Sequence, residues 1–132
     1  GFEVSLGDAL LQPHRSYLNV LDGALASRKV KALAHITGGG LPENLPRVLP
    51  DGVDAEIELG SWPRGPLFEL IAELATGVDI HELHRMLNMG IGMVVVVSPD
   101  DVAEVQATIA EETWQIGTLV AGQSGSRTVH LV

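Results

Sequence analysis

The chain has 132 residues, 45% of them hydrophobic, which is enough for one domain with a buried core and excludes an intrinsically disordered chain. Its 17 acidic and 8 basic residues give a net charge of -9, which repels nucleic acid and anionic membranes as partners. The sequence has no cysteine, which excludes disulfides, thiol catalysis and cysteine-based zinc sites and fits a reducing cytoplasm.

The first predicted elements are a helix and a strand. Apolar side chains recur at helical spacing across residues 16–29, as in an amphipathic helix. Residues 30–34 form an apolar stretch that reads as a strand. Three glycines at residues 38–40 then open the backbone, and Pro42 stands where a short helix can begin.

The order of strand, triple-glycine loop and helix predicts a phosphate-binding loop. Glycine adopts positive φ and allows close approach, so the amides of Gly38, Gly39 and Gly40 can turn toward an anion. A helix that begins behind the loop adds free N–H groups and partial positive charge. A tight turn between two packed elements is the alternative, and the residues alone leave both open.

Residues 53–59 predict a strand with one wet face. Apolar and acidic residues alternate along it, as they do in a half-exposed strand. We therefore expect Asp54, Glu56 and Glu58 to form a solvated stripe rather than a site.

Two helices are expected next, separated by Gly77. The second begins at Asp79, which together with Glu82 is close to a capping box, and ends at about residue 87. The first spans residues 67–76, and its inward side chains are expected to be Leu67, Leu70, Ile71 and Leu74.

The C-terminal part of the chain predicts further strands and one helix. Residues 93–97 are a continuous, mostly β-branched run, typical of a central strand covered on both faces. A strong helix start follows at Ser98, and residues 116–121 and 128–132 read as strands of a hairpin. Helices and strands mix without strict βαβ alternation, which predicts an α+β fold, a layered α/β/α sandwich with a mixed sheet.

A second glycine cluster occupies residues 88–93. It contains Gly-x-Gly, but in the order helix, loop, strand, whereas a dinucleotide-binding fingerprint needs strand, loop, helix. What remains is a loop whose small residues Gly90 and Gly92 admit a close neighbour, and Asn88 can both donate and accept hydrogen bonds. A structural role for this loop is favoured on the residues alone.

Three histidines are candidates for chemistry. His35 ends the first strand beside the triple glycine, where an imidazole can donate to a ligand oxygen or pair with a phosphate; a histidine bonded within the loop is the alternative. His81 and His84 lie one helical turn apart, but no third ligand stands at a suitable spacing, so zinc is not favoured. Trp62 and Trp114 are expected to pack in the core or at its rim, since no basic patch surrounds them.

The apolar runs and the first residues give two further expectations. The longest apolar run, residues 90–97, is too short to span a bilayer, and the first residues lack the pattern of a signal peptide. Because the sequence begins without methionine, we expect it to be a domain excised from a longer protein.

The longest motif resembles a known family. Residues 35–47, His-Ile-Thr-Gly-Gly-Gly-Leu-Pro-Glu-Asn-Leu-Pro-Arg, are similar to the signature of the phosphoribosylformylglycinamidine cyclo-ligases, also called aminoimidazole ribonucleotide synthetases. Segments within residues 10–17, 60–68 and 88–93 agree with that family in order and spacing. The resemblance covers nearly the whole chain and implies the fold of the family's C-terminal domain. His14 and Leu87 depart from the family pattern, and both read as packing changes.

The resemblance also implies an activity. The family closes formylglycinamidine ribonucleotide to aminoimidazole ribonucleotide in purine biosynthesis, with ATP activating the formyl oxygen and ADP and phosphate as products. It implies a cytoplasmic homodimer, with ATP and Mg²⁺ held mainly by an N-terminal domain outside this chain and no metal ligand within it. The isolated domain, residues 1–132, is then expected to be inactive.

Site roles follow from the same resemblance. His35 is the catalytic candidate. A non-catalytic anion-binding or regulatory module on the same fold, or the domain of a related ATP-dependent synthetase, stays open as the alternative. The residues expected to bind the substrate or its phosphate are Thr37, Gly38, Gly39, Gly40, Asn44, Asn88, Gly90 and Gly92.

Overall fold

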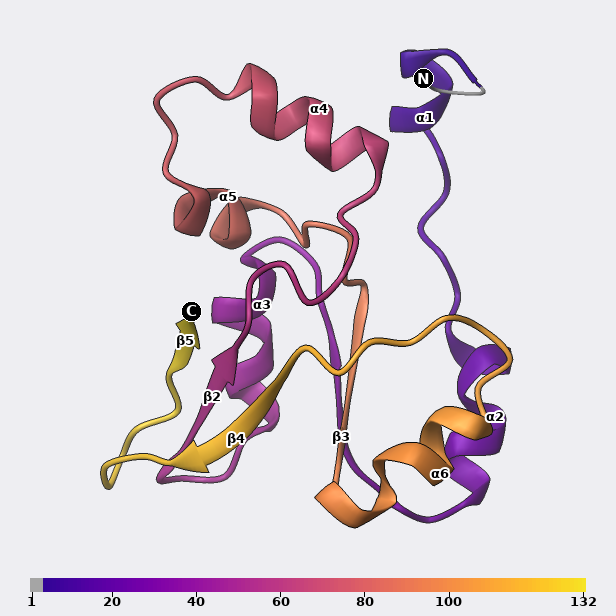
Figure 1. Cartoon of the computed structure of the whole chain (residues 1–132), viewed down its shortest axis with the longest axis vertical. Coiled ribbons are helices and arrows are strands. Elements are labelled where there is room, and N and C mark those ends of the chain that lie inside the picture. The colour runs from indigo at the N-terminus through magenta and orange to yellow at the C-terminus, as the bar shows by residue number, and fades with distance from the viewer. Residues whose placement is uncertain (1–3) are drawn as a thin grey trace.

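The computed structural model describes residues 4–132 and has the α+β architecture that the sequence predicts (Figure 1). The α-helices are α1 (Leu6–Leu10), α2 (Leu18–Ala26), α3 (Gly40–Asn44), α4 (Pro66–Leu74), α5 (Ile80–Met86) and α6 (Val102–Ala107). The strands are β1 (Val30–His35), β2 (Val53–Ile57), β3 (Met93–Val97), β4 (Gly117–Ala121) and β5 (Val129–Leu131). Two short 3₁₀ turns, η1 (Leu45–Val48) and η2 (Pro99–Asp101), continue α3 and precede α6.

The strands form two sheets rather than one. β1 pairs antiparallel with β3, with His35 opposite Met93. In the second sheet β2 lies between β4, to which it is antiparallel, and β5, to which it is parallel, so this sheet is mixed as expected. The predicted hairpin of the last two strands is wrong. Both edges of β2 take a partner, and the connection between β4 and β5 is tied to the turn before β2, where the Gly52 amide donates to the Ser126 carbonyl.

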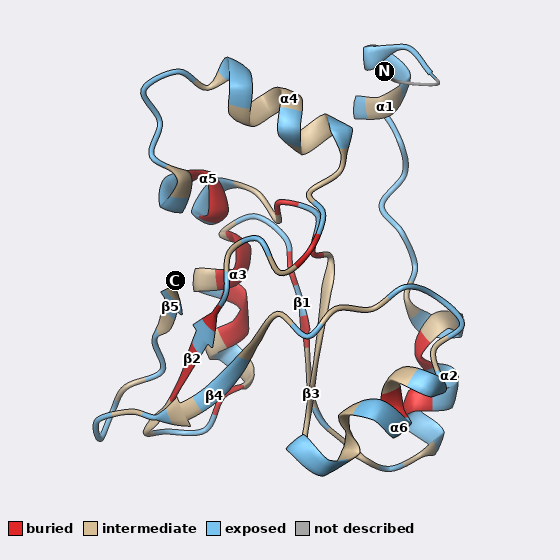
Figure 2. Ribbon diagram, in the orientation of Figure 1, coloured by how far each residue is buried: buried red, intermediate tan, exposed pale blue. Residues whose placement is uncertain are grey.

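The expectation of a central strand at residues 93–97 is also wrong. β3 pairs only with β1 in the described chain, and all of its residues are half-buried (Figure 2). Val94 and Val96 pack against the main core, so the β-branched run serves a strand with one well-packed face.

The main core joins the two sheets through the segment from α3 to η1. Trp62 is buried in it, with its indole N–H donating to the Met89 carbonyl at 2.9 Å, and Trp114 packs at its edge, as the sequence predicts. Across residues 4–132 no helix is long and apolar enough to cross a membrane. The buried core residues are Ala34, Ile36, Leu41, Leu45, Leu49, Ala55, Ile57, Trp62 and Ile91.

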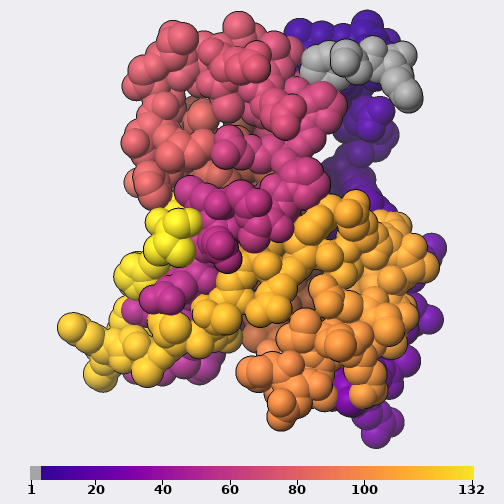
Figure 3. Space-filling model, in the orientation of Figure 1, coloured from indigo at the N-terminus to yellow at the C-terminus, as the bar shows by residue number. Residues whose placement is uncertain are grey.

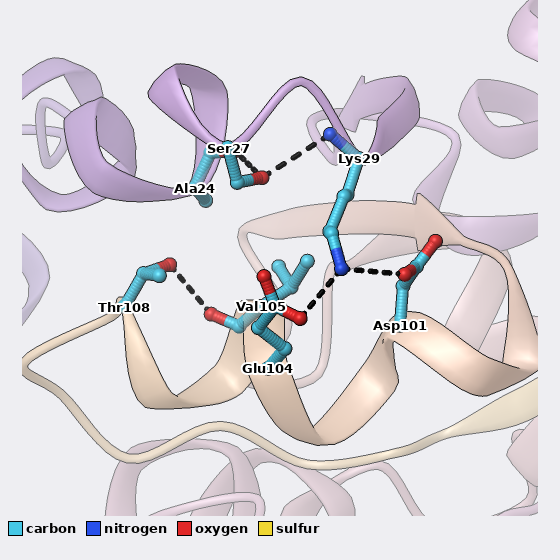
Figure 4. A network of polar contacts seen from close by, with 7 residues as sticks. All are labelled: Ala24, Ser27, Lys29, Asp101, Glu104, Val105 and Thr108. Atoms are coloured by element: carbon cyan, nitrogen blue, oxygen red, sulfur yellow. Dashed lines mark hydrogen bonds and ion pairs between the residues drawn. The ribbon is translucent and has the colours of Figure 1, made fainter.

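A smaller packed unit is formed by α2 and α6. Leu21, Ala24 and Val105 are buried in it. Figure 4 shows how Lys29, just after α2, reaches Asp101 at 2.9 Å and Glu104 at 2.5 Å. These ion pairs hold the start of β1 to the beginning of α6.

The predicted helices are present, with one difference in burial. α4 has no buried residue and Leu74 is 71% exposed, so the inward face expected at Leu67, Leu70, Ile71 and Leu74 is at best half-buried. In Figure 1, α4 stands at the end of the molecule opposite α2 and α6, where it covers little of the core. Asp79 caps α5 as predicted, with its carboxylate accepting from the His81 amide at 2.8 Å.

Asp54 does not belong to a solvated stripe. Its carboxylate is buried and accepts from the Ser126 hydroxyl at 2.6 Å and the Thr128 amide at 2.7 Å. These bonds lower the pKa of Asp54, the Ser126 hydroxyl most. Glu56 and Glu58 are exposed, as expected. Asp54 instead anchors the connection from β4 to β5.

Candidate functional site

A cavity of about 360 Å³ opens beside the triple-glycine loop. Its lining has both polar and apolar groups, which suits a ligand with both an anionic and an apolar part. The lining includes Thr37, Gly38 and Asn88 of the predicted site residues, so the structure brings the two glycine segments together. The residues that line the cavity are His14, Ile36, Thr37, Gly38, Phe68, Met86, Leu87 and Asn88.

The triple-glycine loop is folded by its own polar groups. α3 begins at Gly40, two positions before Pro42, and the Gly40 amide donates to the Thr37 carbonyl at 3.0 Å. The Asn44 side chain is buried and donates to the carbonyls of Gly40 at 2.8 Å and Gly38 at 3.2 Å. Asn44 therefore shapes the loop from inside and is not among the cavity-lining residues.

The three glycines differ in their surroundings. A Cβ at Gly40, whose φ is 56°, would overlap the carbonyl oxygen of His84 on α5, and one at Gly39 would meet Glu43. A Cβ at Gly38 would have no neighbour within 4 Å, because this residue faces the cavity. Within the described residues the amides of Gly38 and Gly39 donate no hydrogen bond; Gly38 lines the cavity, and Gly39 is its neighbour in the chain.

The second glycine segment contributes one residue to the cavity. Asn88 lines it, and its side-chain carbonyl accepts from the Gly90 amide at 3.1 Å. Gly90 lies against the backbone of Arg64, and Gly92 leaves room for the Tyr17 hydroxyl. Gly90 and Gly92 are therefore not among the cavity-lining residues, and at both positions a small residue allows close packing against a neighbouring segment.

His35 lies next to the cavity and does not line it. Its Nε2 is 2.5 Å from the Nε2 of His14, with the two rings edge to face, and the Tyr17 ring lies 6.1 Å away. His14, which does line the cavity, was not among the predicted site residues. The signal that marked it is its departure from the family pattern, and Leu87, the second departure, lines the same cavity.

His81 and His84 do not form a pair of ligands. His81 is exposed, whereas His84 is 1% exposed with its ring perpendicular to that of Trp62. Burial, followed by Arg64 and His81, lowers the pKa of His84 to about 4. In the described part of the chain, no group of three His, Cys, Asp or Glu side chains is placed to hold a metal ion.

Comparison with known proteins places this geometry in context. Residues 1–130 match the family model described as AIR synthase related protein, C-terminal domain. Similar proteins are the phosphoribosylformylglycinamidine cyclo-ligases of Brevibacillus brevis, 45% identical over 121 residues, Burkholderia mallei, 46% over 124, and Bifidobacterium longum, 42% over 127. These matches cover 89%, 92% and 94% of this chain but 35%, 35% and 36% of the relatives. The chain therefore spans about a third of the length of the curated relatives it matches.

Proposed function

The chain belongs to the AIR synthase related protein, C-terminal domain family, and from this premise we propose that it is the C-terminal domain of a phosphoribosylformylglycinamidine cyclo-ligase. The proposed reaction is the ATP-dependent closure of formylglycinamidine ribonucleotide to aminoimidazole ribonucleotide, a step of purine biosynthesis in the cytoplasm. The observation that supports it is the cavity beside the triple-glycine loop, whose Gly38 and Gly39 amides donate no hydrogen bond within the described residues and whose lining also includes apolar side chains.

We propose that the loop holds a phosphate group. Backbone amides aimed at a developing charge are the usual means by which a protein stabilises phosphate oxygens. The amides of Gly38 and Gly39 would donate to these oxygens, and the hydroxyl of Thr37 and the amide of Asn88 would add hydrogen bonds from either side. Gly40 and Asn44 would act indirectly, by fixing the loop in this shape.

The apolar groups that line the cavity would contact the rest of the substrate. These groups include Phe68, Met86 and Leu87, which would exclude water from the reacting groups. ATP, when bound, supplies the phosphoryl group that turns the formyl oxygen into a leaving group. This chain's part is then to fix the substrate so that its own nitrogen lies within reach of the formyl carbon.

The remaining parts of the activity would come from outside this chain. We propose that an N-terminal domain holds most of ATP and Mg²⁺, and that the full-length enzyme is a homodimer. The support for a further domain is that the matching family model describes a C-terminal domain and that the relatives are about three times as long as the matched segment. The roles of ATP, Mg²⁺ and the homodimer rest on the family resemblance. Residues 1–132 alone would then be inactive.

The test is a chimera of this chain with the N-terminal region of the Brevibacillus brevis relative. We expect it to form ADP and aminoimidazole ribonucleotide from formylglycinamidine ribonucleotide and ATP. Gly38→Val, which fills the cavity side of the loop, should lower kcat/KM by about a hundredfold, as expected when a substrate is displaced. Thr37→Val should lower it less.

The matched control is Thr118→Val on β4, where the hydroxyl is exposed. It should keep the activity of the parent chimera. A folded chimera that binds the substrate but forms no product would contradict the proposal and favour the non-catalytic module. Full activity in Gly38→Val would show that the loop does not hold the reacting substrate.

A further inference from the structure

Among the described residues that line the cavity, His14 is the one whose side chain can carry a positive charge. The other lining residues are apolar, neutral or without a side chain. The whole chain has a net charge of -9, so an anion that enters the cavity is repelled by the general field. Attraction must therefore come from local donors, and His14 is the lining group able to supply charge as well as a hydrogen bond.

His14 reaches the cavity from the segment that joins α1 to α2. Figure 3 shows this N-terminal segment, in indigo, running along one edge of the molecule. His35 belongs to β1 and is the last residue of that strand. The contact between the two rings thus joins an extended segment to the strand that leads into the triple-glycine loop.

The distance between the two Nε2 atoms, 2.5 Å, restricts where protons can lie. Only one hydrogen fits between two nitrogens at hydrogen-bonding distance, so one ring donates and the other accepts. If His14 donates its Nε2–H to His35, a protonated His14 still has its Nδ1–H for a ligand. His35 then acts as the acceptor that orients the ring and stabilises its charge.

The Tyr17 ring lies beside both histidines, with its centroid 6.3 Å from that of His14 and 6.1 Å from that of His35. The Arg15 guanidinium lies 5.6 Å from the centre of the Tyr17 ring and is paired with Glu111. Because Glu111 already neutralises Arg15, this arginine adds little net charge for a ligand. The two imidazoles are then the remaining source of positive charge for a ligand.

We propose that His14 is a binding residue of the cavity, where its imidazolium contacts the phosphate group of a sugar phosphate, and that His35 is the positioning residue that accepts its Nε2–H. This inference rests on the proposed function and names a contact within the same site. The phosphate is either the ester group of a ribose phosphate or free inorganic phosphate. The two share the same charge and oxygen geometry, and the experiment separates them.

The experiment is an NMR titration of the 132-residue chain, following the histidine ring signals and the loop amides. Inorganic phosphate and ribose 5-phosphate are added separately. We expect saturable shifts of the His14 ring together with Gly38 and Gly39, because these groups contact the same anion. If the ester is the ligand, ribose 5-phosphate also shifts Leu87 and binds more tightly than phosphate.

Variants separate charge from packing. His14→Gln keeps a hydrogen-bond donor but cannot become positive, and we expect it to bind at least about tenfold more weakly. His35→Leu should weaken binding to a similar degree, because the His14 ring loses its acceptor. His81→Gln, at an exposed histidine on α5, is the matched control and should bind as the parent does.

Two results would overturn the inference. In the first, the Gly38 and Gly39 amides shift while the His14 ring stays still and His14→Gln binds normally; the loop then binds phosphate without the histidine. In the second, no signal shifts saturably with either probe, so His14 holds no phosphate. Neither result bears on ring closure, since product formation by the chimera tests that function separately.

Discussion

Gly40 of α3 lies directly against the carbonyl oxygen of His84 on α5, so closely that a Cβ at this glycine would overlap that oxygen. The φ of Gly40 is 56°, a left-handed conformation that side chains other than glycine rarely adopt. Two constraints, backbone conformation and close approach, thus meet at one residue. This contact seats the triple-glycine loop on α5, beside the cavity.

Gly40→Ala should therefore be severely destabilising. We expect a loss of more than about 3 kcal/mol in the free energy of unfolding, because the methyl group displaces α5 and strains the backbone. Urea denaturation followed by circular dichroism measures it. Gly38→Ala is the matched control: no atom lies within 4 Å of its Cβ, so its stability should change by less than about 1 kcal/mol. Equal stabilities of the two variants would contradict this account of the loop.

Asn44→Ala should loosen the loop from within. The substitution removes the side-chain donor that the Gly40 and Gly38 carbonyls share, and the loss of these two bonds costs about 1–3 kcal/mol. Chemical denaturation gives the value, and hydrogen exchange at Gly38 to Gly40 should become faster. Asn19→Ala, at an exposed asparagine on α2, should stay within about 0.5 kcal/mol of the parent. A similar loss in both variants would mean that Asn44 is not the group that shapes the loop.

Local patterns predicted the elements well, because they depend on neighbours in sequence. The strand at residues 93–97 has the predicted bounds, and β1 is one residue longer than residues 30–34. Pairing was predicted less well. Asp54 bonds to Ser126 and Thr128, which are 72 and 74 positions away, and no local pattern shows that this acid is buried.

In the candidate site too, local patterns were predicted better than contacts between distant parts of the chain. The sequence marks both glycine segments, and the structure brings Gly38 and Asn88 to one cavity. The sequence alone could not show that Gly40 serves packing, since the neighbour that requires glycine is His84, which lies on a helix distant in sequence. Nor could it pair His14 with His35, because an irregular segment of the chain carries His14 to the end of β1.

Asp54→Ala should release the connection between β4 and β5. The Thr128 amide and the Ser126 hydroxyl lose their acceptor, so hydrogen exchange at Thr128 should become faster and Tm should fall. Glu56→Ala, an exposed acid on the same strand, should leave both quantities unchanged. Because the pKa of Asp54 is lowered, its stabilising effect is present above its unfolded-state pKa of 3.8 and is lost as pH falls below it. Unchanged exchange at Thr128 in Asp54→Ala would contradict the anchoring role.

The last prediction concerns His84, whose ring nitrogens have no hydrogen-bond partner in the described structure. Burial lowers its pKa from 6.5 to about 4, so the folded state holds the neutral ring while the unfolded state takes up a proton. The unfolded chain therefore binds more protons between these two values. The free energy of unfolding must then fall as pH drops from about 6.5 toward 4.

His84→Leu isolates this effect, since the other titrating groups are common to both proteins. Near pH 7 the variant should be at least as stable as the parent, because leucine fills a similar space without two unsatisfied nitrogens. From about pH 6.5 to 4 the parent should lose on the order of 3 kcal/mol relative to the variant, at 1.36 kcal/mol for each pKa unit. Urea denaturation across this range measures the difference. Parallel stability curves would show that the buried ring is protonated as readily in the folded chain as in the unfolded one, and His84 would then have a partner that stabilises its charge.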